Sequence, residues 1–206
     1  MNTIGILAYG SLVGDPGPEL AAVTRLIIDN VPTPFGIEYA RSSRGRGGAP
    51  TLIPVDDGGV SVNAKILLLD NDVAPTTARD MLWRRETNRV GSDRAYAPPS
   101  PATPNTVIIT DHPGLANVEL VLATKIGANF SPLTPQKLAE LAIESAASDA
   151  GSQGRDGISY LINARNAGII TPLTARYEQE ILKQSGTDSL SAAWQKLTKQ
   201  SGPTTR

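Results

Sequence analysis

The chain has 206 residues and a formal net charge of −1, so no global field would draw it to nucleic acid or to a membrane. It contains no cysteine, which excludes disulfides, thiolate metal sites and a cysteine nucleophile. Hydrophobic residues make up 40% of the chain and aromatic residues only 4%, so we expect a core built from Leu, Ile, Val and Ala.

No basic segment precedes a long apolar stretch near the N-terminus, so we expect no signal peptide. Apolar runs such as residues 66–69 are strand-sized and too short to cross a bilayer. The expected protein is therefore soluble and cytoplasmic, with neither a membrane nor a nucleic acid as its partner. The sequence leaves its oligomeric state open.

The first two-thirds of the chain is predicted to be rich in β-structure, because short apolar runs alternate with clusters of turn-forming residues. The expected strands cover residues 3–9, 20–31, 35–41, 51–55, 60–69, 106–110 and 119–125. The cluster Asp56-Asp57-Gly58-Gly59 allows positive φ angles, so we expect it to join residues 51–55 and 60–69 as a hairpin.

One helix is expected within this part of the chain. It begins near Pro75, with Thr76 or Thr77 as its N-cap. Residues 97–104 follow it and contain four prolines, which remove backbone donors and restrict the preceding residues, so we expect this stretch to be irregular.

After Phe130 the pattern becomes helical. The expected helices cover residues 134–147, 157–167, 172–184 and 190–199. Asp156 is suited to cap the second of these, and Gly168 and Gly186 are suited to end the second and the third. The pattern as a whole indicates a mixed sheet or barrel with one embedded helix, followed by a helical C-terminal section.

The segment Tyr9-Gly10-Ser11 follows the first predicted strand. A glycine here allows an unusual φ, so successive backbone N–H groups could receive a carboxylate or carbonyl oxygen. An ordinary strand-to-loop turn has the same composition, and the local pattern by itself favours that simpler interpretation.

Glu86 lies in the predicted helix, four residues after Leu82 and three after Trp83, which places the three on a shared face. A carboxylate held beside apolar groups is destabilised as an anion, which is the condition that a general acid or base requires. The alternative is a solvated glutamate paired with Arg79 or Arg89, and the local pattern by itself favours this alternative.

A basic stretch, residues 41–50, contains Arg41, Arg44 and Arg46 among small residues. Arginine offers a bidentate fork for a carboxylate or phosphate, so Arg44 and Arg46 are candidate substrate-binding residues. The stretch can be interpreted as a flexible loop without a partner, as an anion clamp over a pocket, or as a contact with RNA or DNA. The last lacks interleaved aromatic residues and a net positive charge.

The single histidine, His112, lies beside proline in an expected loop, where we expect a surface role. With one histidine and no cysteine, a zinc site would have to rely on carboxylates. Ser11 has no nearby His–Asp pattern for a catalytic triad. We expect no metal and no cofactor.

These segments together resemble the motifs of a known protein superfamily. Residues 6–12, Ile-Leu-Ala-Tyr-Gly-Ser-Leu, resemble the opening strand and substrate loop of the γ-glutamyl cyclotransferase-like superfamily, which includes AIG2-like proteins. Residues 48–55 resemble the family's next strand, and Trp83-Arg84-Arg85-Glu86 resembles the helix that bears its catalytic glutamate. Motif order and spacing fit over residues 3–125. The Tyr-Gly-Ser-Leu-Val loop is closer to AIG2-like variants than to the asparagine-bearing loop of the glutathione-pathway enzymes.

The resemblance implies a mixed β-barrel with flanking helices over residues 1–129. The helices over residues 130–206 lie outside it, and we expect them to form a helical C-terminal extension that packs on the barrel. The resemblance also implies a transferase or lyase that releases 5-oxoproline from a γ-glutamyl amide or peptide, with Glu86 as general acid/base. The expected partner is a small γ-glutamyl or other carboxylate ligand. The loop residues implied to bind it through backbone N–H groups are Tyr9, Gly10, Ser11 and Leu12.

Two other functions remain open at this point. A non-catalytic protein on the same scaffold could bind a small carboxylate or phosphate, with the arginines of residues 41–46 as its clamp. Alternatively, the C-terminal helices could dock on a partner protein.

Overall fold

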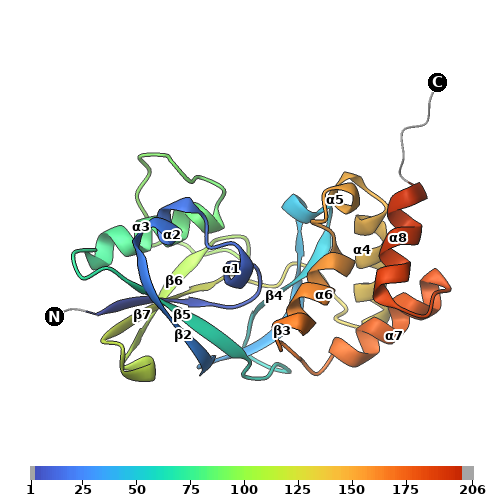
Figure 1. Cartoon of the computed structure of the whole chain (residues 1–206), viewed down its shortest axis with the longest axis horizontal. Helices are drawn as coiled ribbons and strands as arrows, with labels where there is room; N and C mark the ends of the chain where they lie inside the picture. The colour runs from blue at the N-terminus through green and yellow to red at the C-terminus, as the bar shows by residue number, and fades with distance from the viewer. Residues whose placement is uncertain (1–2, 201–206) are drawn as a thin grey trace. The chain divides into compact units, whose positions relative to one another are not determined.

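The structure, a computed structural model, describes residues 3–200, and its mixture of helices and strands confirms the predicted α+β class (Figure 1). The chain divides into two compact units. The first comprises Met1–Pro34 and Ser61–Gly127, and the second comprises Phe35–Val60 and Ala128–Arg206. This division differs from a single boundary between residues 129 and 130, because residues 35–60 belong with the C-terminal helices.

The first unit is built on a mixed five-stranded sheet (Figure 1). Its strands are β1 (Ile4–Ala8), β2 (Thr24–Pro32), β5 (Asn63–Leu69), β6 (Ile108–Pro113) and β7 (Leu120–Lys125). They lie in the order β2-β5-β1-β7-β6, with β1 parallel to β7 and antiparallel to β5. Strand β1 is central and buried along its whole length, as its short apolar run predicts.

A closed barrel, which the family resemblance implies, is not formed by either sheet among residues 3–200. Strands β2 and β6 are the two edges of the five-stranded sheet. Register shifts interrupt β2 on both sides of Leu26–Ile28, and β6 ends at Pro113, which has no N–H to donate. Bulges and prolines are typical of edge strands, so these residues favour an open sheet.

Three helices accompany this sheet: α1 (Ser11–Gly14), α2 (Pro18–Val23) and α3 (Pro75–Glu86). Residues 20–23 of α2 were expected to begin a strand, but Pro18 begins a helix there as its N1 residue. Helix α3 begins at Pro75 as predicted, although its N-cap is Ala74, so the predicted caps Thr76 and Thr77 are wrong.

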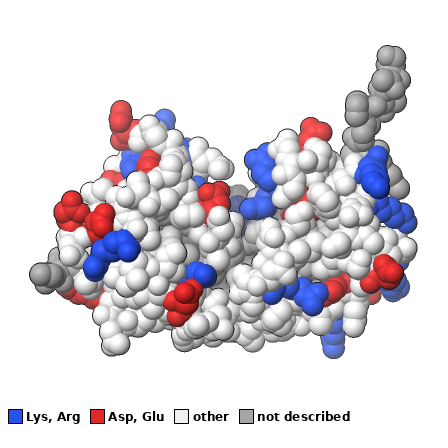
Figure 2. All heavy atoms as spheres, viewed as in Figure 1, with Lys and Arg blue, Asp and Glu red and all other residues white. Residues whose placement is uncertain are grey.

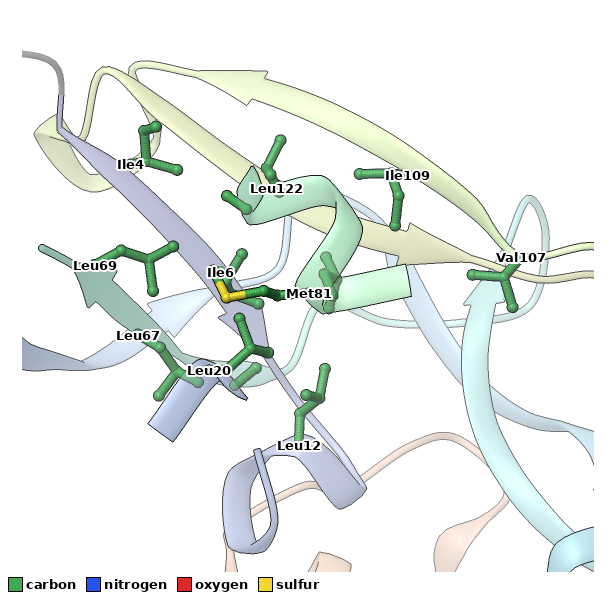
Figure 3. Packing of buried hydrophobic residues seen from close by; sticks show 13 residues of the cluster. Ile4, Ile6, Leu12, Leu20, Leu67, Leu69, Met81, Val107, Ile109 and Leu122 are labelled. Atoms are coloured by element: carbon green, nitrogen blue, oxygen red, sulfur yellow. The ribbon is translucent and has the colours of Figure 1, made fainter. Parts of the chain in front are cut away.

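The core of the first unit lies between the sheet and α3 (Figure 3). Ile4 and Ile6 of β1 face Met81 of α3, and Leu12 of α1 joins the same cluster. This packing fixes α3 against β1, and therefore fixes the end of α3 relative to the loop that follows β1. The position of Glu86 depends on it.

The predicted hairpin of residues 51–55 and 60–69 is wrong. Strand β4 (Ala49–Val55) pairs with β3 (Gly36–Ser43) in a separate two-stranded sheet, whereas β5 pairs with β1 and β2. Residues 66–69 of β5 are buried on both faces, which is typical of a central strand with a neighbour on each side. The turn between β3 and β4 contains the short 3-10 helix η1 (Arg44–Arg46) and Gly47, whose φ is 61°.

The second unit combines the β3–β4 hairpin with five helices among the described residues. They are α4 (Pro135–Ala146), α5 (Asp149–Ser152), α6 (Gly157–Asn166), α7 (Thr174–Ser185) and α8 (Leu190–Gln200). The Thr134 side chain accepts a hydrogen bond from Lys137 N, and Asp156 caps α6 as predicted. Gly186 ends α7 with a φ of 62°.

A buried carboxylate joins β3 to the segment that leads into α7. Glu38 is 1% exposed, and its Oε1 accepts hydrogen bonds from Thr171 Oγ1 at 2.6 Å and from Tyr39 N at 2.8 Å. Its Oε2 accepts one from Leu173 N at 3.1 Å. Burial raises the pKa of Glu38, and the three hydrogen bonds oppose that rise to a smaller extent.

The surface agrees with the near-zero net charge. On the face drawn in Figure 2, basic and acidic side chains are scattered among uncharged residues on each unit. Within residues 3–200 no helix is both long enough and apolar enough to cross a bilayer.

Candidate functional site

The loop after β1 adopts the unusual backbone that the sequence predicts. Gly10 has φ 59° and ψ −127°, a conformation that a residue with a Cβ rarely adopts. It turns the chain directly into α1, which begins at Ser11. The N–H groups of Ser11 and Leu12 belong to the first turn of that helix and so have no acceptor within it.

Two of the four predicted loop residues anchor the loop with their side chains. The Tyr9 side chain is 7% exposed, and its hydroxyl donates to the carbonyl oxygen of Thr124 on β7 at 2.9 Å. The Leu12 side chain is 3% exposed and packs in the core cluster. Any contribution of these residues to a ligand would therefore come from their backbone, whereas Ser11 also offers its hydroxyl.

The Ser11 hydroxyl and the Glu86 carboxylate are joined by one guanidinium nitrogen. Nη1 of Arg85 donates to Ser11 Oγ at 3.2 Å and to Glu86 Oε1 at 2.7 Å. The Glu86 side chain is 23% exposed, and the Arg85 side chain 13%. The structure thus brings together Ser11 and Glu86, two predicted site residues that are far apart in the sequence.

The partner of Glu86 is neither of the arginines considered from the sequence. Arg79 forms an ion pair with Asp111 at 2.6 Å, and the Arg89 guanidinium lies over the Trp83 ring, 5.0 Å from its centroid. Glu86 is the last residue of α3, where a side chain can turn away from the apolar face. Its carboxylate therefore meets Arg85 instead of lying only against the apolar groups that the helical spacing suggests.

Arg85 also holds the far end of the loop. Its Nε and Nη2 donate to the carbonyl oxygen of Asp15 at 3.1 and 2.5 Å, and Nη2 lies 4.0 Å from the Asp15 carboxylate. From the sequence, Arg85 is apparent only as a neighbour of Glu86. Its contact with Asp15 spans 70 residues of sequence, and no local pattern predicts such a pair.

Arg84, the preceding residue, forms a separate network. Its Nη2 and Nε lie 2.7 and 2.8 Å from Glu19 Oε2, and Glu19 Oε1 also accepts a hydrogen bond from Gly91 N at 2.7 Å. The hydrogen bond from Arg84 lowers the pKa of Glu19. Arg84 thus connects α2 to the segment after α3 and contacts none of the predicted site residues.

The predicted binding residues Arg44 and Arg46 lie in the second unit, in the turn between β3 and β4. The Arg46 guanidinium lies over the Tyr160 ring, 4.9 Å from its centroid. Arg44 is exposed, and its charge is close enough to Arg41 to influence the pKa of the Arg41 guanidinium. Burial, and to a smaller extent Arg44, lowers the pKa of Arg41. The clamp assigned to these arginines stays a prediction.

His112 lies in β6 and not in a loop. Its Nε2 is 3.0 Å from Thr110 Oγ1, and burial lowers its pKa while Asp111 opposes that shift. Nowhere in residues 3–200 do three or more His, Cys, Asp or Glu side chains gather in a way that could hold a metal ion.

In comparisons with known proteins, no family model and no curated protein matches this sequence.

Proposed function

We propose that this chain is a cytoplasmic enzyme of the γ-glutamyl cyclotransferase-like type, which releases 5-oxoproline from a γ-glutamyl amide or peptide. The observation that carries the proposal is the shared contact at Arg85 Nη1, which joins the Ser11 hydroxyl to the Glu86 carboxylate. Two of the three segments that carry the family resemblance, residues 6–12 and 83–86, thus meet at one nitrogen.

The reaction needs only the substrate and one carboxyl group. The α-amine of the γ-glutamyl group attacks its γ-carbonyl carbon, a C–N bond forms in the ring, and the original amide C–N bond breaks. Of the three ammonium protons, one remains on the lactam nitrogen and two end on the departing amine. Glu86 carries these protons between the two nitrogens, and general acid/base assistance of this kind contributes about 10²–10⁴-fold.

The loop after β1 provides the complementary half of the site. The N–H groups at the start of α1, which have no acceptor within the helix, and the Ser11 hydroxyl are donors for a carboxylate or carbonyl oxygen of the substrate. Because attack is intramolecular, holding the γ-glutamyl group in a folded conformation supplies much of the acceleration.

The test is release of 5-oxoproline by purified protein from a panel of γ-glutamyl amides and dipeptides, measured by mass spectrometry. Glu86→Gln keeps the shape of the side chain and should abolish turnover, whereas the control Glu119→Gln changes an exposed glutamate of the same unit and should not. The proposal fails if no substrate in the panel yields product, or if Glu86→Gln retains full turnover.

A second candidate function is the binding of a small carboxylate or phosphate without catalysis. It is favoured by the second unit's arginines, where Arg44 lies near Arg41 and Arg46 is held over Tyr160. Titration with orthophosphate and with glutarate separates the two functions, because a binder gives saturable affinity and no product. In that case Arg46→Gln should weaken binding, and Lys137→Gln on the same unit should not.

A further inference from the structure

The Arg85 guanidinium uses all three of its nitrogens on groups of the first unit. Nε and Nη2 donate to the Asp15 carbonyl, while Nη1 donates to Ser11 and to Glu86. With a side chain only 13% exposed, Arg85 keeps little surface for a ligand. Its charge and geometry are directed to the protein itself.

We infer that Arg85 is a positioning residue, which sets the loop of residues 10–17 and the Glu86 carboxylate in one geometry. Its effect on turnover rests on the proposed function, whereas its effect on the loop does not. Arg85 acts through Ser11, Asp15 and Glu86 and does not itself need to touch the substrate.

The hydrogen bonds from Arg85 also decide which atoms remain available for chemistry. Ser11 Oγ accepts from Arg85, so its own hydrogen is left to donate to a substrate oxygen. Glu86 Oε1 is taken by Arg85, while Oε2 has no hydrogen-bonding partner among the described residues. Oε2 is thereby the oxygen left for proton transfer.

Only arginine has the geometry for this arrangement. Its planar fork places donors on both sides of Cζ, so one side reaches Asp15 while the other reaches Ser11 and Glu86. A lysine ammonium is a single point and cannot span both. The loop makes room for the arginine stem at Gly17, where an added Cβ would lie 3.1 Å from Arg85 Cγ.

The first test measures the loop without any assay of turnover. Amide hydrogen exchange in residues 10–17 is compared between wild type, Arg85→Lys, Arg85→Ala and the control Arg84→Ala. We expect exchange there to become at least tenfold faster in both Arg85 variants and to be unchanged in Arg84→Ala. Unchanged exchange in Arg85→Lys and Arg85→Ala overturns the inference, as does equal acceleration in the control.

The second test measures turnover. Its expected pattern in kcat and KM differs from the one that a loss of stability alone would produce. We expect kcat to fall by about 10²-fold in Arg85→Lys with KM changed less than about threefold, because misplacing a catalytic group affects the rate more than binding. Methylguanidinium should restore part of the kcat of Arg85→Ala. A rise in KM alone, or an absence of rescue in a folded Arg85→Ala, overturns the catalytic part of the inference.

The two tests fail in distinguishable ways. If the wild-type protein yields no 5-oxoproline, the proposed function fails, and hydrogen exchange alone decides whether Arg85 holds the loop. If wild type turns over and the Arg85 variants match it, the proposed function stands and the positioning role is rejected. Arg85→Lys serves as the deciding variant where Arg85→Ala does not fold.

Discussion

Arg85 and Ser11 are 74 residues apart in sequence, yet Nη1 of the arginine lies 3.2 Å from the serine hydroxyl oxygen. The contact joins the end of α3 to the start of α1 within the first unit. A loop and a helix that the sequence predicts to form one site are thus held to each other by a hydrogen bond.

Replacing Ser11 by alanine removes an acceptor of a charge-assisted hydrogen bond that is partly buried. We expect the free energy of unfolding to fall by about 1 kcal/mol, since one hydrogen bond contributes that order of magnitude. Urea unfolding followed by circular dichroism measures it, with Ser191→Ala at an exposed position as the control. A double substitution of Ser11 and Arg85 that is fully additive would contradict a direct interaction.

Local sequence patterns predicted which segments form helices and strands better than they predicted which strands pair. The helix expected over residues 134–147 is α4, with Thr134 as its cap, because amphipathic spacing and capping are both encoded within a few residues. The expected 51–69 hairpin failed for the opposite reason. Gly58 and Gly59 suit a turn, but burial of residues 66–69 on both faces requires two strand neighbours from elsewhere in the chain.

The same distinction applies to the site. Gly10 was recognisable from sequence because only glycine readily adopts its backbone angles. Arg85 was not, because its role depends on where the packing of α3 against β1 places the last turn of the helix. Glu38 is a further case, because nothing in the sequence around it indicates that its carboxylate accepts three hydrogen bonds within the protein.

Gly17 is the point where the loop passes the stem of Arg85, with φ 77° and ψ 157°. This backbone region is open almost only to glycine, and an added Cβ would also press on Arg85 Cγ at 3.1 Å. We expect Gly17→Ala to lower the free energy of unfolding by about 1–3 kcal/mol. The matched control is Gly14→Ala, whose Cβ would meet nothing within 4 Å, and thermal unfolding of the two variants should differ clearly. Equal stability of both would contradict the strain at Gly17.

The buried carboxylate of Glu38 makes the stability of the second unit depend on pH. Burial raises its pKa above the ordinary value of 4.5, so the folded state binds the proton more tightly than the unfolded chain does. Stability from this linkage is fully present below the unfolded-state pKa and is lost as pH rises through the folded-state pKa.

Glu38→Gln removes the titrating group. The free energy of unfolding of the wild type minus that of the variant should therefore shrink or reverse as pH rises from about 4 towards neutrality, the window set by the raised pKa. Urea unfolding over this series measures it, with Glu144→Gln at an exposed position as the control. A difference that grows with pH would mean that the hydrogen bonds from Thr171, Tyr39 and Leu173 outweigh desolvation.

Three tyrosine side chains lie together in the second unit. The ring of Tyr39 is 5.3 Å from that of Tyr177 and 6.4 Å from that of Tyr160, in edge-to-face geometry. The Tyr177 hydroxyl is buried and has no hydrogen-bonding partner in the part of the chain that the structure describes, whereas the Tyr160 hydroxyl accepts from Leu52 N at 3.3 Å.

Because one hydroxyl is unpaired and the other accepts a hydrogen bond, we expect opposite effects from replacing each of these two tyrosines by phenylalanine. Tyr177→Phe removes an unpaired buried group and should raise the free energy of unfolding by about 1 kcal/mol, while Tyr160→Phe leaves Leu52 N–H unpaired and should lower it by about as much. Thermal unfolding of both variants measures the contrast, with near-ultraviolet circular dichroism to check the packing of the remaining rings. If Tyr177→Phe is as destabilising as Tyr160→Phe, its hydroxyl is paired in solution, and a buried water molecule is then the partner to look for.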